Sequence, residues 1–290
     1  MKELKQITVI GLGLLGGSVT LAVNRCFADI KTIGFTHRPA TRRKARRLAV
    51  ANKIVSDLQQ SVKKSDIVIL ATPIYTFKKI FEQIADFLPK GSIVTDVGST
   101  KTLPHKWAEK LLPDTVYYVG SHPIAGSEQR GVEFARDDLF YQAKCILTAT
   151  KKTNPAAVDT LKRFWTRLGS SVIVMQPAAH DRILANVSHL PHITAAALVN
   201  ANSSSQLRLA GKGFIDTTRI ASGPANIWAD ILLTNVSNCS QGIDKMTAEL
   251  KKIKKAIRSG SRNRLEKLLA CAQSKRNEMI QDKLKKREPL

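Results

Sequence analysis

The stretch that decides the fold is ITVIGLGLLGGSVTLAV, residues 7–23. Its first four residues form an apolar run of strand length, and a helical pattern continues after the glycines to about Arg25. Between the two lie Gly11, Gly13 and Gly16, with the spacing G-x-G-x-x-G. In this context the first glycine permits a tight turn, the second lets a pyrophosphate approach the backbone, and the third lets the helix pack on the strand. The stretch therefore predicts a dinucleotide site with the phosphates at a helix N-terminus.

Strand-like and helix-like segments alternate after this opening. Further apolar runs of strand length lie at residues 31–35, 66–71, 92–97, 116–120, 145–149 and 171–175. Helical patterns lie between them, including 39–52 and a segment near 154–168. Such alternation is typical of a doubly wound parallel sheet. We expect the last two runs to extend the same sheet.

The pattern changes after residue 176, where strand-like runs stop and long helical patterns cover 178–202, 225–258 and 261–286. A length of 290 residues also fits two domains, at about 150 residues per domain. We therefore predict an α/β chain, with a Rossmann domain over 1–176 and an all-α substrate-binding and dimerisation domain over 177–290, ending in a basic tail. Helices so long and apolar are hard to bury in one small domain, which favours a homodimer formed through them.

The composition narrows the class of partner. The formal net charge of +23 suits anionic partners, but no zinc-finger spacing, aromatic RNA-binding run or repeat accompanies it. We expect a small anionic substrate rather than nucleic acid. Four widely spaced cysteines predict neither a disulfide framework nor a metal site and favour the cytoplasm. Residues 7–23 are too short and too glycine-rich for a membrane span, so no membrane partner is expected.

The end of the second predicted strand bears on the choice of cofactor. An acidic residue about twenty positions past the fingerprint binds the ribose 2′-hydroxyl in NAD enzymes, whereas Thr36, His37 and Arg38 stand here. A hydroxyl and a guanidinium suit the 2′-phosphate of NADP, each charge-assisted hydrogen bond contributing roughly 1.5–3 kcal/mol. We predict NADP in preference to NAD, although these arginines would also fit an ordinary helix surface. The expected cofactor-binding residues are Gly11, Gly13, Leu14, Leu15, Gly16, Thr36, His37, Arg38, Arg42, Thr72, Pro73 and Ser99.

Polar segments follow three of the predicted strands, at 71–73, 96–101 and 120–123. Ligands of open parallel sheets bind outside the carboxyl ends of the strands. Removing hydride from an alcohol needs a nearby base, and histidine titrates in the right range. His122 is therefore the candidate base. His189 and His192 lack a third ligand at diagnostic spacing, so no metal site is predicted.

Five motifs in order carry a family resemblance: G-L-G-L-L-G-G-S, D-V-G-S-T-K, S-H-P-I-A-G-S-E-Q-R-G-V, V-S-H-L-P-H and G-F-I-D-T-T-R-I-A. Between about residue 5 and about residue 235 the chain resembles the prephenate/arogenate dehydrogenases of tyrosine biosynthesis. The resemblance implies NAD(P)-dependent oxidative decarboxylation of prephenate to 4-hydroxyphenylpyruvate, or of arogenate to tyrosine. Hydride leaves the ring carbon that bears the 4-hydroxyl, and the ring carboxylate leaves as CO2.

The resemblance also implies roles for single residues. His122 would be the base, Ser99 would orient it together with the ring hydroxyl, and Arg219 would hold the ring carboxylate as a bidentate ion pair. Further substrate-binding residues implied in this way are His192, Ser188, Glu128, Asp216 and Trp228. His105 and His180 are expected to be ordinary surface or packing histidines, and Arg219 would also suit a structural ion pair with Asp216.

Two other classes of protein stay open. A β-hydroxyacid-type dehydrogenase shares the two-domain plan but commonly uses a catalytic lysine in its helical domain, where this chain offers His192 and Arg219. A Rossmann scaffold that only binds ligands would need no base at His122. The sequence leaves the choice between prephenate and arogenate open.

Overall fold

The structure is a computed structural model of the chain and describes residues 4–125 and 129–285. Packing divides the chain into two compact units, residues 1–238 and 239–290. The domain boundary predicted at residue 176 lies within the first unit and stays a prediction.

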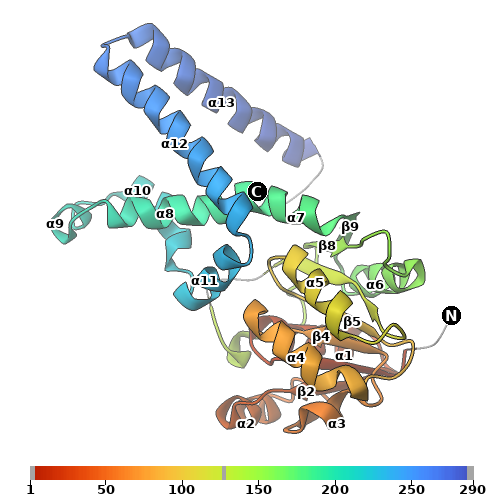
Figure 1. Cartoon of the computed structure of the whole chain (residues 1–290). Helices are drawn as coiled ribbons and strands as arrows, with labels where there is room; N and C mark the ends of the chain where they lie inside the picture. Colours follow the sequence, from red (N-terminus) through yellow and green to blue (C-terminus); the bar gives the residue numbers. More distant parts are fainter. Residues whose placement is uncertain (1–3, 126–128, 286–290) are drawn as a thin grey trace. The chain divides into compact units, whose positions relative to one another are not determined.

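A six-stranded parallel sheet forms the centre of the first half of the chain (Figure 1). Its strand order is β3-β2-β1-β4-β5-β6. Its strands are β1 Gln6–Ile10, β2 Lys31–Phe35, β3 Lys53–Val55, β4 Ile67–Leu70, β5 Ile93–Asp96 and β6 Tyr117–Tyr118. The helices that connect them are α1 Leu14–Cys26, α2 Pro39–Arg47, α3 Leu58–Val62, α4 Phe77–Ile84 and α5 Thr102–Leu111. The predicted doubly wound sheet is confirmed.

The alternation of side chains along β4 shows why both faces of this sheet are covered. Ile67 and Ile69 belong to one apolar cluster, which α1 covers, whereas Val68 and Leu70 belong to a second cluster under α4 and α5. A strand buried on both faces has to be apolar at every position, which is the run that the sequence displays.

The last three strands form a sheet of their own, which corrects the expectation that the runs at 145–149 and 171–175 extend the first one. These strands are β7 Gly120–Ile124, β8 Lys144–Thr148 and β9 Ser171–Met175. β7 runs antiparallel to β8, and β8 runs parallel to β9 across α6, Pro155–Arg167. The predicted strand 116–120 divides between β6 and β7, because the backbone pairs with β5 only as far as Val119 and with β8 from Gly120 on.

The first unit is helical from residue 177 on, as predicted. Its helices are α7 Pro177–Leu184, α8 Leu190–Asn200, α9 Ser204–Leu207, α10 Lys212–Thr218 and α11 Ala225–Leu233. The single helix predicted over 178–202 is interrupted by a π-helical turn, Ala185–His189. Pro191 has no N–H to donate to the carbonyl of Val187, so the regular helical hydrogen bond is lost at this point.

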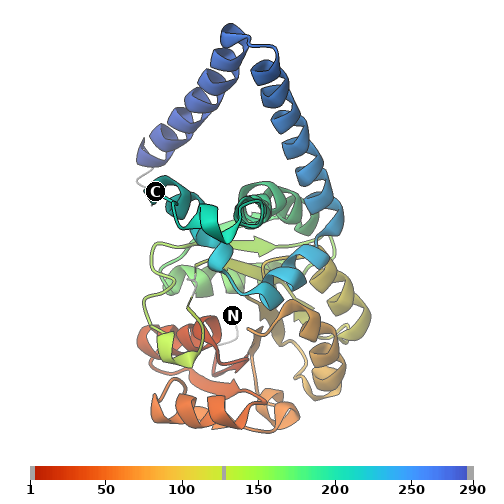
Figure 2. The same ribbon diagram turned by 90° about the vertical axis from the view of Figure 1, so that its left-hand side faces the viewer.

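Two long helices dominate the rest of the chain. α12 spans Val236–Arg258 and α13 spans Arg262–Lys285, and the two diverge from the turn that joins them (Figure 2). Across residues 4–125 and 129–285, no helix combines the length and the apolar character that a membrane span requires.

Candidate active site

The fingerprint loop after β1 has the shape that a dinucleotide needs. Gly11 has a φ of +101°, and a Cβ there would lie 2.6 Å from the carbonyl oxygen of Ala71. A Cβ on Gly16 would overlap the carbonyl oxygen of Gly11, whereas one on Gly13 would meet no atom of the described residues within 4 Å. Glycine is thus required for folding at two positions, and at the third it leaves open space beside the backbone. A pyrophosphate fits this arrangement.

The start of α1 favours an anion. Gly13 is the N-cap residue and has no side chain to cap the helix, and the first turn contains no acidic residue. The first backbone N–H groups therefore remain available to phosphate oxygens, and the positive end of the helix dipole points toward them. Leu14 and Leu15 are half-buried and pack on the core, so they hold this turn in place.

The end of β2 carries the residues expected near the ribose. Thr36 is buried, and the Arg42 guanidinium donates to the carbonyl oxygens of Thr36 at 2.8 Å and His37 at 3.0 Å. Arg38 is exposed at the N-cap of α2. Arg42 therefore braces the loop, and Arg38 presents an exposed positive charge beside it.

The polar segment after β4 reaches the same loop. The methyl group of Thr72 would lie 2.7 Å from a Cβ on Gly11, so the two segments touch. Thr72 also shares a 2.7 Å hydrogen bond with Thr76, which donates to the carbonyl oxygen of Pro73. The ends of β1, β2 and β4 thus meet, as the predicted cofactor site requires.

His122 lies in the middle of β7 and is half-buried. Its Nδ1 is 2.8 Å from Nε2 of His180, and Nδ1 of His180 is 2.9 Å from Oδ1 of Asp181. Removal from water lowers the pKa of His122 well below its ordinary value, and His180 acts in the same direction. At neutral pH His122 is therefore a neutral imidazole with a nitrogen able to accept a proton.

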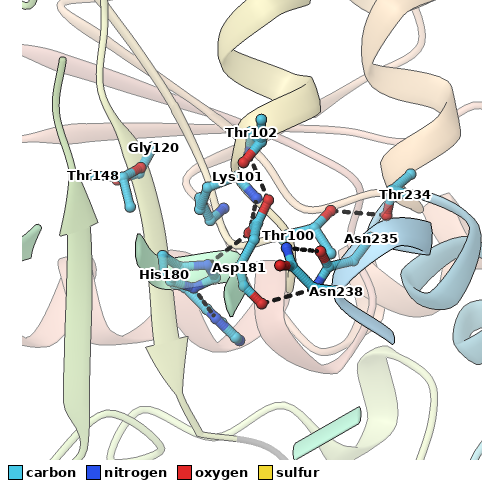
Figure 3. Close-up of polar contacts among 12 residues, drawn as sticks. Thr100, Lys101, Thr102, Gly120, Thr148, His180, Asp181, Thr234, Asn235 and Asn238 are labelled. Carbon is cyan, nitrogen blue, oxygen red and sulfur yellow. Dashed lines mark hydrogen bonds and ion pairs between the residues drawn. The ribbon is translucent and has the colours of Figure 1, made fainter. Parts of the chain in front are cut away.

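Asp181 is fixed by the start of α5. The backbone N–H of Lys101 donates to Oδ1 at 2.8 Å, and that of Thr102 donates to Oδ2 at 2.8 Å (Figure 3). Burial acts to raise the pKa of Asp181, but the hydrogen bonds from His180, Thr102 and Lys101 outweigh it and lower the pKa. The carboxylate is thus ionised, and it caps the orphan N–H groups of a helix.

A buried ion pair shapes the loop after β5. The Lys101 ammonium pairs with Asp96, both side chains are fully buried, and Asp96 also accepts from the Tyr118 hydroxyl at 2.7 Å. Ser99 is half-buried on this loop, and its neighbour Thr100 shares a 2.8 Å hydrogen bond with Thr234 of the helical part. Within the described residues no hydrogen bond joins Ser99 to His122, so the orienting role of Ser99 stays a prediction.

The predicted substrate residues His192 and Trp228 form a stacked pair, with ring centroids 3.6 Å apart and planes at 11°. Nδ1 of His192 is buried and has no hydrogen-bond partner in the described part of the chain. Such atoms are rare in folded proteins, because an unpaired buried polar atom costs about 1–3 kcal/mol. A ligand atom at this position would remove the cost.

A path of contacts joins this pair to His122. The Trp228 ring meets His189 edge-on at 6.3 Å, and His189 Nδ1 is 3.3 Å from the Asn235 amide nitrogen. The same amide donates to the backbone carbonyl of Asp181 at 2.8 Å (Figure 3). Residues from α7, the π-helical turn, α8 and α11 thus converge on the segment that bonds His122.

The remaining predicted substrate residues are less tightly bound into this cluster. Arg219 is exposed and begins a 3-10 turn, Arg219–Ser222. The Asp216 carboxylate accepts from Lys212 at 2.7 Å. Ser188 is half-buried in the π-helical turn, and Glu128 lies outside the described residues.

Sequence reasoning missed His180 and Asp181. His180 is fully buried and bonds His122, so it is not an ordinary packing histidine, whereas His105 bonds Thr148 at 2.9 Å and packs against Tyr118. The adjacent His-Asp pair was a visible signal in the sequence, but nothing in it indicated His122, 58 positions earlier. No three metal-ligating side chains come together between residues 4 and 285, the gap at 126–128 excepted.

Known proteins resemble the chain along most of its length. The nucleotide-binding domain of prephenate dehydrogenase matches residues 19–174, and the dimerization domain of prephenate dehydrogenase matches residues 176–271. The prephenate dehydrogenase of Bacillus subtilis is 35% identical over 262 residues, which cover 88% of this chain and 71% of the relative. The cyclohexadienyl dehydrogenase of Zymomonas mobilis is 31% identical over 266 residues, covering 89% and 90%.

A solved structure extends the likeness to three dimensions. The prephenate dehydrogenase of A. aeolicus, crystallised with hydroxyphenyl propionate and NAD+, superposes with a TM-score of 0.90 at 32% identity. The match covers 96% of this chain and 99% of that one. With a dinucleotide loop, a neutral imidazole and family matches over both halves, the chain belongs to the prephenate dehydrogenase family of nicotinamide-dependent oxidoreductases.

Proposed function

We propose that this protein oxidises and decarboxylates prephenate or arogenate with a nicotinamide cofactor, and that His122 is the base. The observation that carries the proposal is the neutral, half-buried imidazole of His122 on β7, next to the strand that leads into the Ser99 loop. Burial that lowers its pKa keeps the ring unprotonated near neutral pH, which is the form that a base needs.

The proposed reaction balances as follows. His122 takes the proton of the ring hydroxyl while hydride leaves the ring carbon that bears this hydroxyl. A bound nicotinamide would supply the hydride acceptor. The bond from the ring to its carboxylate then breaks, its electron pair stays in the ring, and CO2 departs. The ring becomes aromatic, and its oxygen recovers the proton from His122. The products are one phenol, one CO2 and one reduced cofactor.

Several side chains would bind the substrate. Arg219 would hold the ring carboxylate through two parallel hydrogen bonds. The unpartnered Nδ1 of His192 would bond a polar substrate atom, and Trp228, stacked on the same ring, would form a wall. Ser99 would contact the hydroxyl. Ser188, Asp216 and Glu128 are carried over from the family resemblance as further substrate-binding residues.

We infer a preference for NADP over NAD. Support comes from the end of β2, where a buried Thr36 stands in place of a carboxylate and Arg38 is exposed. Arg42 already donates to two backbone carbonyls, so Arg38 is the better placed partner of a 2′-phosphate. The A. aeolicus structure holds NAD+, which makes a direct comparison of the two cofactors in this chain necessary.

We also infer a homodimer and a functional boundary near residue 176. The match of residues 176–271 to a dimerization domain supports both inferences. Large apolar side chains remain exposed in the single chain after that boundary, including Val187 at 68% and Leu209 at 88%.

The test is the formation of reduced cofactor, followed by its near-ultraviolet absorbance. Prephenate and arogenate are each paired with NAD and NADP, and His122→Asn is measured beside the wild type. We expect turnover in at least one pairing, and His122→Asn should lower kcat by ~10²-fold or more, the scale of a general base.

Binding of the reduced cofactor, NADH or NADPH, is measured separately by its fluorescence. Cofactor binding without turnover in all four pairings would contradict the proposal. A panel of 3-hydroxyacids would then decide whether the chain acts as a β-hydroxyacid dehydrogenase.

A further inference from the structure

Two buried residues behind His122 have no part in the reaction as proposed above. His180 is 0% exposed and Asp181 is 1% exposed, and both lie in α7. An imidazole and a carboxylate are costly to bury, so each needs a compensating partner. The partner of His180 on one side is Asp181, and on the other side it is the candidate base itself.

The hydrogen bonds around Asp181 determine where the protons lie. Both of its oxygens accept backbone N–H groups, from Lys101 and Thr102, so the side chain acts as an acceptor. Nδ1 of His180 must therefore donate to Oδ1, and in the neutral ring Nε2 of His180 carries no hydrogen. Nε2 then accepts from Nδ1 of His122, and the neutral His122 is left with a bare Nε2.

The surroundings favour a neutral His122, a neutral His180 and an ionised Asp181. Burial lowers the pKa of both His122 and His180, and hydrogen bonds lower that of Asp181. Asn235 adds a further restraint, because its amide donates to the backbone carbonyl of Asp181 (Figure 3). Helix, loop and strand thus hold one arrangement of the three side chains.

We propose that His180 and Asp181 are positioning residues that hold His122 in the tautomer whose Nε2 is free to take the proton of the substrate hydroxyl. The proposal rests on the proposed function, in which His122 is the base. Neither residue touches the substrate in this scheme. They act through His122 alone, as a carboxylate acts through the histidine of a serine-protease triad.

The tautomer is measured directly on the full chain labelled with 15N-histidine, by two-bond 1H–15N correlation at neutral pH. The His122 signals are identified by their loss in His122→Asn. We expect a protonated Nδ1 and a bare Nε2 in the wild type.

Kinetics with a matched pair of variants test whether catalysis depends on the hydrogen bond that His180 accepts from His122. His180→Gln places an amide oxygen near the former Nε2, where it accepts from His122, whereas His180→Asn keeps the contact with Asp181 and does not reach His122. We expect kcat to fall by ~10²-fold in His180→Asn and by no more than ~10-fold in His180→Gln, since only the first loses the orienting acceptor. The KM for substrate and the affinity for cofactor should change little in either.

The outcomes distinguish the positioning role of His180 and Asp181, here called the relay, from the proposed function. A bare Nε2 on His122, together with better activity in His180→Gln than in His180→Asn, supports the relay. A protonated Nε2 on His122 in the wild type, or equal kcat values for the two variants, overturns it. Absence of turnover in the wild type would overturn the proposed function, while the spectrum would still report the tautomer.

Discussion

At the scale of single residues, burial governs the chemistry of the histidines. Withdrawal from water lowers the pKa of His105, His122, His180, His189 and His192. The charged form of imidazole loses hydration energy when it is buried, and the partners here do not replace all of it. The site therefore contains neutral rings that can accept hydrogen bonds and protons, and its positive charges come from arginine and lysine.

Arg219 allows a sharp test at this scale. Arg219→Lys keeps the positive charge but loses the planar fork that bonds both oxygens of a carboxylate. We expect the KM for the substrate to rise by ~10-fold or more, because a charge-assisted hydrogen bond contributes roughly 1.5–3 kcal/mol. Steady-state kinetics measure this, with the KM for cofactor as the internal control. An unchanged substrate KM with a lowered melting temperature would assign Arg219 a structural role instead.

At the scale of elements, the turn between β1 and α1 shows how one loop serves folding and binding through different glycines. The positive φ of Gly11 and the close carbonyl of Ala71 are demands of the fold. A Cβ on Gly13 would meet no atom of residues 4–125 and 129–285 within 4 Å. A cofactor pyrophosphate would account for this open space.

Alanine at these two positions should therefore have different effects. Gly13→Ala should leave the melting temperature unchanged and weaken cofactor binding, because its methyl group meets only the ligand. Gly11→Ala should lower stability by about 1–2 kcal/mol or more, the cost of a left-handed backbone, and should also weaken binding. Thermal unfolding and cofactor titration by fluorescence measure both effects. Equal cofactor affinity in Gly13→Ala and the wild type would contradict the assigned pyrophosphate position.

At the scale of the whole molecule, the buried histidines make stability depend on pH. Burial lowers the pKa of His189 to about 4, from 6.5. Because the folded-state pKa is the lower one, the unfolded chain binds a proton first as the pH falls. The contribution of neutral His189 to the free energy of unfolding is thus fully present above pH 6.5. It is lost progressively as the pH falls toward 4, by at most about 3 kcal/mol.

Urea unfolding at a series of pH values between 7 and 4 tests this expectation. The free energy of unfolding should fall steadily with pH, and His189→Gln should flatten the slope. His37→Gln changes an exposed histidine and serves as the control. If the free energy of unfolding depends on pH as steeply in His189→Gln as in the wild type, His189 does not contribute to the pH dependence.

The exposed apolar side chains lead to a prediction about assembly. We expect the chain to sediment as a dimer, and Leu209→Lys, at a side chain 88% exposed in the single chain, to shift the equilibrium toward monomer. Tyr141→Lys is the control, because Tyr141 is 64% exposed but lies before residue 176. Analytical ultracentrifugation measures the mass. A monomeric wild type would refute the inferred homodimer.

Much of this molecule follows from patterns that are local in the sequence. The strand, glycine turn and helix of residues 7–23 are adjacent, so their periodicity and spacing predict the cofactor loop before any packing is known. The alternation of apolar runs likewise predicts the parallel sheet, because every crossover demands a helix of matching length. After residue 176 the strand-like runs stop and long helical periodicities begin, and this local change predicts the helical part.

Only the tertiary structure decided the partners of side chains far apart in the sequence. His122 and His180 are 58 residues apart, and Lys101 and Asp181 are 80 apart, yet both pairs bond at 2.8 Å. Whether β7 joins the first sheet or pairs with β8 also depends on competing partners and not on its own residues. Local periodicity specifies which face of an element is buried, whereas the packing of whole elements specifies what that face meets. The residues that orient the candidate base were for that reason visible only in the folded chain.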